Sequence, residues 1–427
     1  MSTAVRAVEQ VETPARRFGL GRPFAAQLAS TGLANLGDGV LTTLAPLVAL
    51  GLTTSPAQIS LLSAAAWLPW LLLGIGAGVV IDRVDRRRAQ VLALTMRAAV
   101  LATGAALGFA GALSMPLLVV LVLVYGATEV FADLAATSIV PDLVPAERLP
   151  AANGRVVGVQ QVANVFLGAP LAGVLVVLGA GIGFGTSAAL AALAAVVLAV
   201  GLRGNFRKAP AAGRASSPLA QVREGLAFVV HHPVIRPLVL TSSVLNLAST
   251  AYFAVFVLWA VGPGSAMGLT EAQYPLVMLG FAAGAVGGSL VTEAVTARLG
   301  EVRTMVASLT GSVLLMLVPV FWPNGWAVAG AVTLIGITNT VGNVVAQSLR
   351  QRLVPGELLG RVGGATRTLA FGLMPLGAVL GGLVAEQAGL ATTFLAAVGL
   401  SLVACGYVAL TVRTATISAA EAANAPH

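Results

Sequence analysis

The 427-residue sequence has few of the residues with which proteins face water or build reactive centres. Only 9% of its residues are charged, against about 25% in ordinary soluble domains. This excludes a soluble enzyme, a disordered chain and a DNA-binding protein. The single Cys405 excludes a disulfide framework. Three histidines without cysteine partners exclude a conventional zinc site, so we expect no bound metal.

Long hydrophobic segments make up most of the chain, since 57% of its residues are hydrophobic. A helix needs about 20 apolar residues to cross a bilayer. Apolar runs between glycine, proline or charged breaks predict twelve spans. Each must be a helix, because lipid offers no partner to a free backbone group. The predicted spans are residues 24–50, 58–81, 89–113, 116–138, 155–178, 182–202, 234–262, 274–297, 302–322, 326–349, 360–385 and 390–412.

The basic residues gather on one side of these spans. All but two of the 24 Lys and Arg residues lie in the N-terminal segment or follow even-numbered spans. By the positive-inside rule, both termini are cytoplasmic. The net charge of +8 is then a topology signal, with anionic lipid headgroups as its partner. We expect a multi-pass protein of the cell membrane. In a bacterium that has two membranes, this is the inner membrane.

The two halves of the chain resemble each other. Leu143-Val-Pro-Ala-Glu147 matches Leu353-Val-Pro-Gly-Glu357 at an offset of 210 residues, and the same offset relates Gly78 to Gly288. The predicted fold is all-α, with twelve transmembrane helices in two pseudo-symmetric six-helix bundles. The predicted parts are an N-terminal cytoplasmic tail (1–23), a first bundle (24–202), a central cytoplasmic loop (203–233), a second bundle (234–412) and a C-terminal cytoplasmic tail (413–427).

The connection after the second span combines a glycine, acids and arginines at fixed spacing. Gly78 stands one turn before Asp82, which Arg83 and Arg86 follow. The glycine allows close approach of helices, and the acid can pair with arginines of a neighbouring helix and hold one conformation. This loop resembles the signature loop of the major facilitator superfamily. The resemblance implies two bundles that rock around a central site. Asp133 lies towards the cytoplasmic end of the fourth span, and this position predicts that it is a partner of Arg83 or Arg86 in the conformational latch.

Further stretches are similar to the branch of that superfamily that contains drug-efflux proteins and exporters of siderophores, macrolides and enterobactin. They are Asn35-Leu-Gly-Asp38-Gly39, Asn153-Gly-Arg155, Arg223-Glu-Gly-Leu-Ala-Phe228 and Gly168-Ala-Pro170-Leu-Ala-Gly173. The resemblance implies a monomeric secondary transporter that exports small amphipathic compounds or drugs by proton antiport. No ATP-binding motif is present, so a proton gradient replaces any cofactor, and we expect no enzymatic activity.

Two alternatives to export stay open. A facilitator or importer of the same fold would use Asp38 to bind its substrate and would move no protons. A receptor or lipid-handling membrane protein would carry no flux that depends on these polar groups.

Ionisable residues inside spans are costly and suggest function. Asp38 lies about 14 residues into its span, roughly 21 Å at 1.5 Å per residue, which is near mid-membrane. We interpret Asp38 as a proton-binding residue with Asn35 on the same face; the alternative is a carboxylate held for packing. Glu129, at the depth of Arg97 in the antiparallel third span, is predicted to pair with it, as a proton site or a counter-ion.

The remaining candidates are a second arginine, a cavity lining and sites of helix packing. Arg367 in the eleventh span is expected to be a buried charge that pairs with Asp82 or Asp85, or attracts an anionic substrate group. Substrate-cavity candidates are Asn35, Tyr252, Phe256, Asn339 and Asn343. Helix-packing candidates, expected at the seam between the halves, are Gly168, Pro170, Gly173, Gly284, Gly288, Gly377 and Gly381.

Overall fold

The computed structural model describes residues 21–207, 218–262, 264–355 and 358–424. In this part of the chain, twelve helical segments are long and apolar enough to cross a membrane, and each overlaps one predicted span. The predicted all-α fold is therefore confirmed. The predicted N-terminal tail lies almost entirely outside the described residues.

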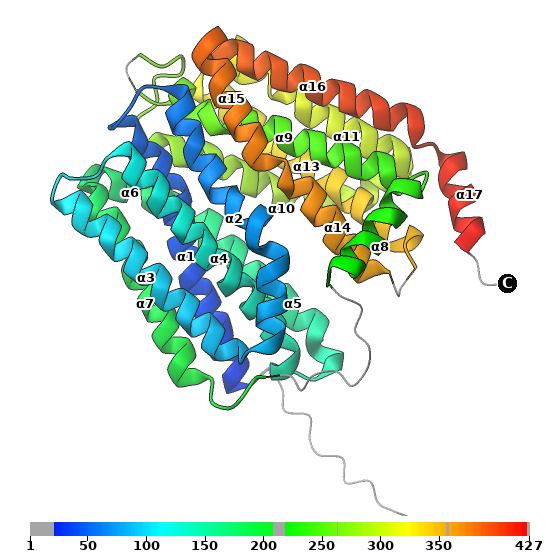
Figure 1. Cartoon of the computed structure of the whole chain (residues 1–427). Coiled ribbons are helices and arrows are strands. Elements are labelled where there is room, and N and C mark those ends of the chain that lie inside the picture. The colour runs from blue at the N-terminus through cyan, green and yellow to red at the C-terminus, as the bar shows by residue number, and fades with distance from the viewer. Residues whose placement is uncertain (1–20, 208–217, 263, 356–357, 425–427) are drawn as a thin grey trace, which may run out of the picture.

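Two bundles of six spans lie side by side (Figure 1). The first contains α1 (Arg22–Leu50), α2 (Pro56–Arg83), α3 (Arg86–Phe109), α4 (Met115–Leu143), the short η1 (Ala146–Arg148), a composite fifth span of α5 (Leu149–Gln161), the π-helical η2 (Val162–Gly168) and α6 (Ala169–Leu178), and α7 (Ala180–Gly201). The second contains α9 (Ile235–Ala260), α10 (Gln273–Leu299), α11 (Glu301–Leu315) with α12 (Val318–Phe321), α13 (Gly325–Leu353), α14 (Leu359–Gly372) with α15 (Met374–Ala388), and α16 (Leu390–Thr411).

Two further helices lie where the sequence predicted only a loop and a tail. They are α8 (Pro218–His231), within the predicted central loop, and α17 (Thr414–Asn424) in the C-terminal tail. Val229 of α8 and Ile417 of α17 are buried in one apolar cluster of the second bundle. Short helices are marginal alone and gain stability from such packing, which local sequence does not reveal.

The repeat seen in the sequence is also present in the structure. Gly179 and Gly389, 210 residues apart, form one-residue turns between spans with φ of 109° and 89°, which favour glycine. At the ends of the third and fourth spans, Arg86 pairs with Asp142 at 2.8 Å. In the second bundle, Arg352 stands at the position equivalent to Asp142 and pairs with Glu301 at 2.6 Å. Equivalent helix ends in the two bundles are thus joined by an ion pair, but the acid and the arginine have exchanged places.

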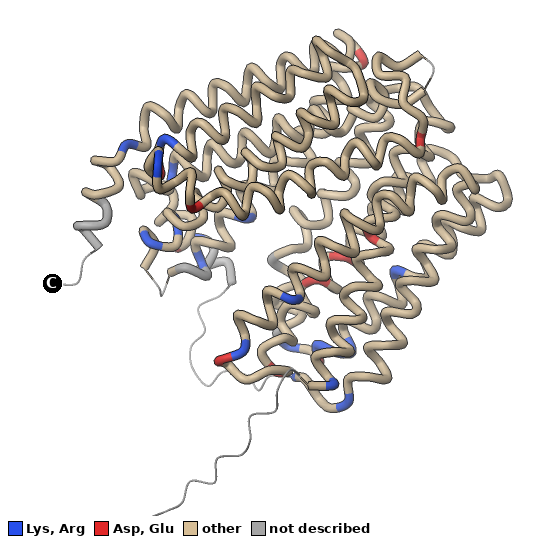
Figure 2. The backbone as a smooth tube through the Cα atoms, turned by 180° about the vertical axis from the view of Figure 1, so that it is seen from behind, with Lys and Arg blue, Asp and Glu red and all other residues tan. Residues whose placement is uncertain are grey.

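Most of the charged residues mark one end of the molecule. We call the end that carries α8, α17 and the connections 84–85, 144–148 and 202–207 the basic end, because Lys and Arg gather there (Figure 2). The opposite end carries connections 51–55, 110–114 and 322–324, which contain no Lys or Arg.

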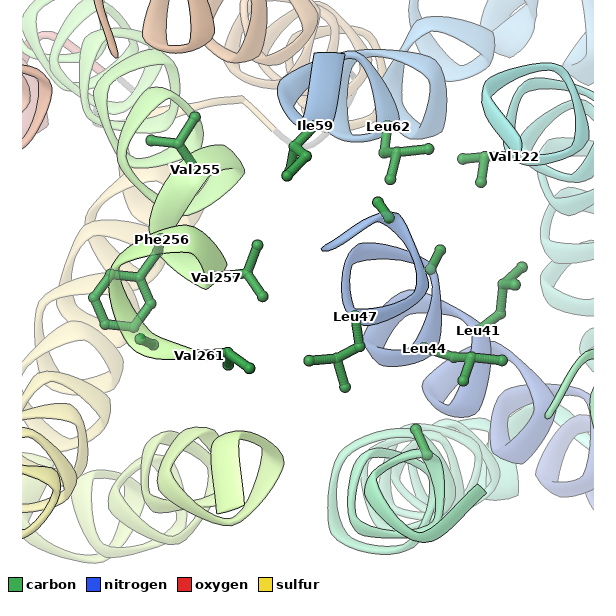
Figure 3. Packing of buried hydrophobic residues seen from close by; sticks show 14 of the residues in the cluster. Leu41, Leu44, Leu47, Ile59, Leu62, Val122, Val255, Phe256, Val257 and Val261 are labelled. Atoms are coloured by element: carbon green, nitrogen blue, oxygen red, sulfur yellow. The ribbon is translucent and has the colours of Figure 1, made fainter. Parts of the chain in front are cut away.

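Among the described residues, the hydrophobic clusters that combine both bundles lie in the half of the helices nearer the opposite end. One buried cluster there combines Leu47 of α1 and Ile59 of α2 with Val257 and Val261 of α9, and the last two point towards Leu47 (Figure 3). At the basic end the buried clusters are separate, each within a single bundle. Hydrophobic burial therefore holds the halves together at the opposite end and not at the basic end.

Polar and small residues complete the joint at the opposite end. Ser55, which caps the start of α2, donates a 2.8 Å hydrogen bond to Glu386 of α15. On the other flank, α6 packs against α10, where a Cβ added to Gly173 would lie 3.1 Å from Pro275. At the seam, α2 (span 2) thus packs against α15 (span 11), and α6 (span 5) packs against α10 (span 8).

Candidate functional site

A buried ion pair between α1 and α3 lies at the centre of the first bundle. Nη1 of Arg97 is 2.6 Å from Oδ1 of Asp38, and the two residues are 2% and 7% exposed. The Tyr125 hydroxyl of α4 donates a hydrogen bond to the same carboxylate oxygen. The Arg97 guanidinium also lies 5.0 Å from the centre of the Tyr125 ring, a cation–π distance. Three helices thus meet at one carboxylate.

Glycines on either side of Asp38 let α1 approach its neighbours. A Cβ at Gly37 would lie 3.4 Å from the backbone oxygen of Ser187 in α7. A Cβ at Gly39 would collide with the backbone of Asn164 in η2. Small residues on both sides therefore seat α1 between α7 and η2, and this fixes the position of the Asp38 carboxylate.

Two more carboxylates continue the site along α4. Glu129 and Asp133 follow Tyr125 by one and two turns, and both are partly exposed. Arg97 interacts electrostatically with Glu129 as well as with Asp38. Asp133 lies in electrostatic range of Arg97 and of Arg367, which belongs to the other bundle. Three carboxylates of the first bundle thus share one buried guanidinium, and we call Asp38, Arg97, Tyr125, Glu129 and Asp133 the charge network.

The predicted pairing of Arg97 with Glu129 is wrong: the ion pair of Arg97 is with Asp38. Depth along antiparallel helices placed Arg97 and Glu129 at one level, but it could not show that α1 comes closer to α3. Tyr125 was missed. Its position one turn before Glu129 on α4 was the signal that could have identified it.

Arg97 is expected to stabilise the fold strongly. Arg97→Gln would leave the Asp38 carboxylate buried without its counter-ion, and breaking a buried pair in this way costs about 3–5 kcal/mol. We expect a clearly lower Tm in detergent for this variant and almost no change for Arg298→Gln, whose side chain is exposed. A double variant, Asp38→Asn with Arg97→Gln, should recover much of the loss. If it does not, the pair is not the source of the effect.

Arg367 bridges the two bundles through aromatic rings. Its guanidinium carbon lies 5.2 Å from the ring centre of Trp70 in α2 and 5.8 Å from that of Phe371 in α14. Trp67 of α2 stacks on Phe371 at 5.9 Å. The prediction that Arg367 is buried is wrong, because its side chain is exposed at the seam.

The expected partner Asp85 is engaged elsewhere. Its carboxylate caps α3 by accepting from the N–H of Arg88 and also accepts from the N–H of Phe206. The side chain of the other expected partner, Asp82, lies outside the described residues.

The predicted latch is only partly assembled. Arg86 pairs with Asp142, at the end of α4, rather than with Asp133, which lies nine residues or about 13 Å deeper in the bundle. A Cβ added to Gly78 or to Gly74 would have no neighbour within 4 Å. The face of α2 that carries Gly74 and Gly78 is therefore open, whereas Ala77 and Ile81 in the same stretch are buried, at 2% and 1% exposure.

Gly78 and Gly288, equivalent in the repeat, should respond differently to valine. A Cβ at Gly288 would lie 2.6 Å from the backbone oxygen of Ile337, so Gly288→Val is expected to destabilise the fold. Gly78→Val should leave the Tm nearly unchanged but lower transport, because α2 needs this glycine if the basic end closes. Thermal unfolding and flux of both variants test this. Full transport by folded Gly78→Val would contradict it.

The other packing glycines separate into two groups. Gly284 and Gly288 pack against α13, and Gly377 and Gly381 against α9, so all four lie within the second bundle rather than at the seam. Gly168 packs against α1 inside the first bundle, and Pro170 starts α6 after the π-helical turn. Of this set, Gly173 is the one that contacts the other bundle.

Tyr252 and Phe256 do not line a cavity. Each is only 1% exposed, the Tyr252 hydroxyl donates to the backbone oxygen of Met316, and both rings pack on Phe394. Their one-turn spacing placed them on one face, but that face is turned into the second bundle. Asn35 is partly exposed and donates to the backbone oxygen of Thr31. Asn343 is exposed and donates to Asn339, so this polar pair does reach the surface of α13.

Two bundles of six spans are the architecture of a multi-pass membrane protein of major facilitator type, and the family match and the relatives identify a transporter rather than an enzyme. The sequence matches the family model described as transmembrane secretion effector over residues 22–427, and the chain belongs to this family.

Three comparisons place the chain among known proteins. It is 26% identical over 399 residues to the multidrug efflux pump Tap of Mycobacterium tuberculosis, which covers 90% of this chain and 91% of that protein. A mutant form of the nucleoside transporter NupG shares the fold with a TM-score of 0.76 at 13% identity, over 92% of this chain and all of that one. A bacterial homologue of the lysosomal transporter Spinster, inward-facing and unoccupied, has a TM-score of 0.69 at 15% identity, over 93% and 97%.

Proposed function

We propose that the protein exports small amphipathic compounds in exchange for protons, by alternating access between its two bundles. The family match and the likeness to a multidrug efflux pump support export. The observation that carries proton coupling is the charge network, in which Asp38, Glu129 and Asp133 share the buried guanidinium of Arg97.

The charges of this network do not balance. Three carboxylates face one guanidinium of the same bundle, and Arg367 of the other bundle offsets only one more charge. An uncompensated charge away from water is costly. Binding a proton removes the excess, and so does binding a cationic group. Proton and cationic substrate would therefore compete for the network, which is the condition for exchange.

The geometry around Arg97 gives the proton a way to act on the protein. The buried Nε of Arg97 has no hydrogen-bond partner among the described residues, so the guanidinium has a donor left for a second acceptor. A proton on Asp38 would weaken the 2.6 Å ion pair and let Arg97 move towards Glu129, one turn from Tyr125 on α4. Protonation would in this way move α3 and α4 relative to α1.

The seam can transmit this change to the second bundle. Asp133 of the network attracts Arg367 across the seam, where Arg367 also lies over Trp70. A proton on Asp133 would weaken that attraction and alter the balance between the two arrangements of the bundles. In the cell, we place the basic end in the cytoplasm, following the positive-inside rule. The present arrangement would then be open to the cytoplasm.

Transport into proteoliposomes tests the proposal. With an imposed pH gradient, the protein should accumulate a lipophilic cation such as ethidium above equilibrium, and nigericin should abolish the accumulation. The exposed-residue variant Glu147→Gln and empty liposomes are the controls. A flux that runs only downhill and ignores the gradient would instead identify a facilitator.

A further inference from the structure

A groove separate from the charge network opens at the basic end of the first bundle. It has a volume of about 750 Å³ and lies between the ends of α2 and α3 and the middle of α4, with Gly204, Asn205 and Arg207 at its edge. This volume is within the range of about 300–1,000 Å³ usual for small-molecule sites. Figure 1 shows α2 and α3 on either side of α4 in this region.

The inner part of the groove is apolar and open to the surroundings. Leu92 and Met96, one turn apart on α3, are 61% and 51% exposed, and Val124 of α4 is 39% exposed. From Arg88 at its mouth to Met96, the groove follows two turns of α3, or about 12 Å at 1.5 Å per residue. In a membrane-spanning segment, such an exposed apolar stripe is in contact with lipid chains.

The mouth of the groove is basic. Arg83, Arg88 and Arg207 line it from α2, α3 and the connection after α7, and their side chains are exposed. One acid, Asp85, also lines the groove, but its carboxylate already accepts hydrogen bonds from the backbone N–H groups of Arg88 and Phe206. Among the side chains that the structure describes, the mouth therefore presents three guanidinium groups and one carboxylate that is already engaged.

We infer that this groove binds one acidic phospholipid, with its phosphate headgroup among Arg83, Arg88 and Arg207 and an acyl chain along Leu92 and Met96. Guanidinium groups bind phosphate oxygens in charge-assisted, often bidentate hydrogen bonds. The apolar stripe suits an acyl chain, and the order of the two parts, basic at the helix ends and apolar further in, is the order of headgroup and chain in one leaflet. The inference does not depend on proton coupling.

At this position the lipid would act on the arrangement of two helix ends. The groove includes Val80, Val84 and Asp85, so its occupant would contact the end of α2 and the turn from α2 to α3. Gly78, whose added Cβ would meet nothing within 4 Å, lies one turn before this end of α2. A lipid held there would fix the ends of α2 and α3 relative to each other.

Native mass spectrometry of the full-length protein tests the inference. The protein is titrated in detergent with phosphatidylglycerol and, separately, with phosphatidylcholine. We expect one phosphatidylglycerol to be retained in preference to phosphatidylcholine. Arg88→Gln with Arg207→Gln should lower that retention about thirtyfold, because each of the two basic groups near the headgroup contributes. Met96→Trp, which fills the apolar part, should lower it as well.

Two matched variants serve as controls. Arg298→Gln changes the residue equivalent to Arg88 in the second bundle, and Leu290→Trp adds the same ring at a position that is 79% exposed. Both should retain the lipid as the wild type does, and gel filtration verifies that each variant is folded. Equal retention in all variants, or equal binding of the two lipids, would overturn the inference. So would loss of ethidium binding, with phosphatidylglycerol retained, in Met96→Trp, since the groove would then belong to the transported compound.

Discussion

Asp38→Asn is expected to abolish gradient-driven accumulation of substrate, reducing it to the level of empty liposomes. Asparagine keeps the shape of the side chain and an oxygen that can accept from Arg97 and Tyr125. It cannot take up a proton, so the network loses the group that links the ion pair to the gradient. The measurement is ethidium accumulation in proteoliposomes under an imposed pH gradient.

The variant should remain folded, and this separates it from Arg97→Gln. The Arg97 guanidinium still has Glu129 in electrostatic range when the Asp38 charge is removed. We therefore expect Asp38→Asn to keep its gel-filtration profile and to exchange labelled for unlabelled substrate without a gradient. Accumulation at the wild-type level by the folded variant would contradict a coupling role for Asp38.

A disulfide across the seam at the opposite end is expected to stop transport completely and reversibly. A Cβ at Gly173 in α6 would lie 3.4 Å from the Cα of Ala272, beside the start of α10, so Gly173→Cys with Ala272→Cys should cross-link. The bond would hold together the end at which the bundles already meet and prevent them from rocking. Flux should fall to background after oxidation and return with dithiothreitol.

A second pair of cysteines controls for the chemistry of cross-linking. A Cβ at Gly342 would lie 3.5 Å from the Cβ of Ser308, within one bundle, so Gly342→Cys with Ser308→Cys should also form a disulfide. This bond crosses no moving seam and should leave most of the flux. The native Cys405 is buried. Undiminished flux with the Gly173–Ala272 pair fully oxidised would exclude rocking about this seam.

Hydrophobicity alone was enough to predict the membrane-spanning part of the fold. A bilayer allows only helices of sufficient apolar length, so each run predicted a span that the structure contains. The helices α8 and α17 could not be predicted in this way. Their stability comes from packing of residues such as Val229 and Ile417 onto a bundle that is distant in the sequence.

The sequence predicted how deep the site residues lie in the membrane, but not which neighbouring helix each side chain faces. Composition and position identified Asp38, Arg97 and Glu129 as costly residues within spans, and the structure places them together. Position along a helix could not tell which neighbour a side chain faces. For that reason Asp38 was missed as the partner of Arg97, and Phe256 was assigned to a cavity although it is buried in an aromatic cluster.

The most direct test of the account is a count of protons released when substrate binds. Purified protein in weakly buffered detergent, with a pH indicator, is mixed with ethidium at a pH where the network holds its proton. The account predicts release of about one proton per protein in the wild type, because a cation and a proton compete for one uncompensated charge, and none in Asp38→Asn. Substrate binding that releases no proton from the wild type, or the same release from Asp38→Asn, would contradict it.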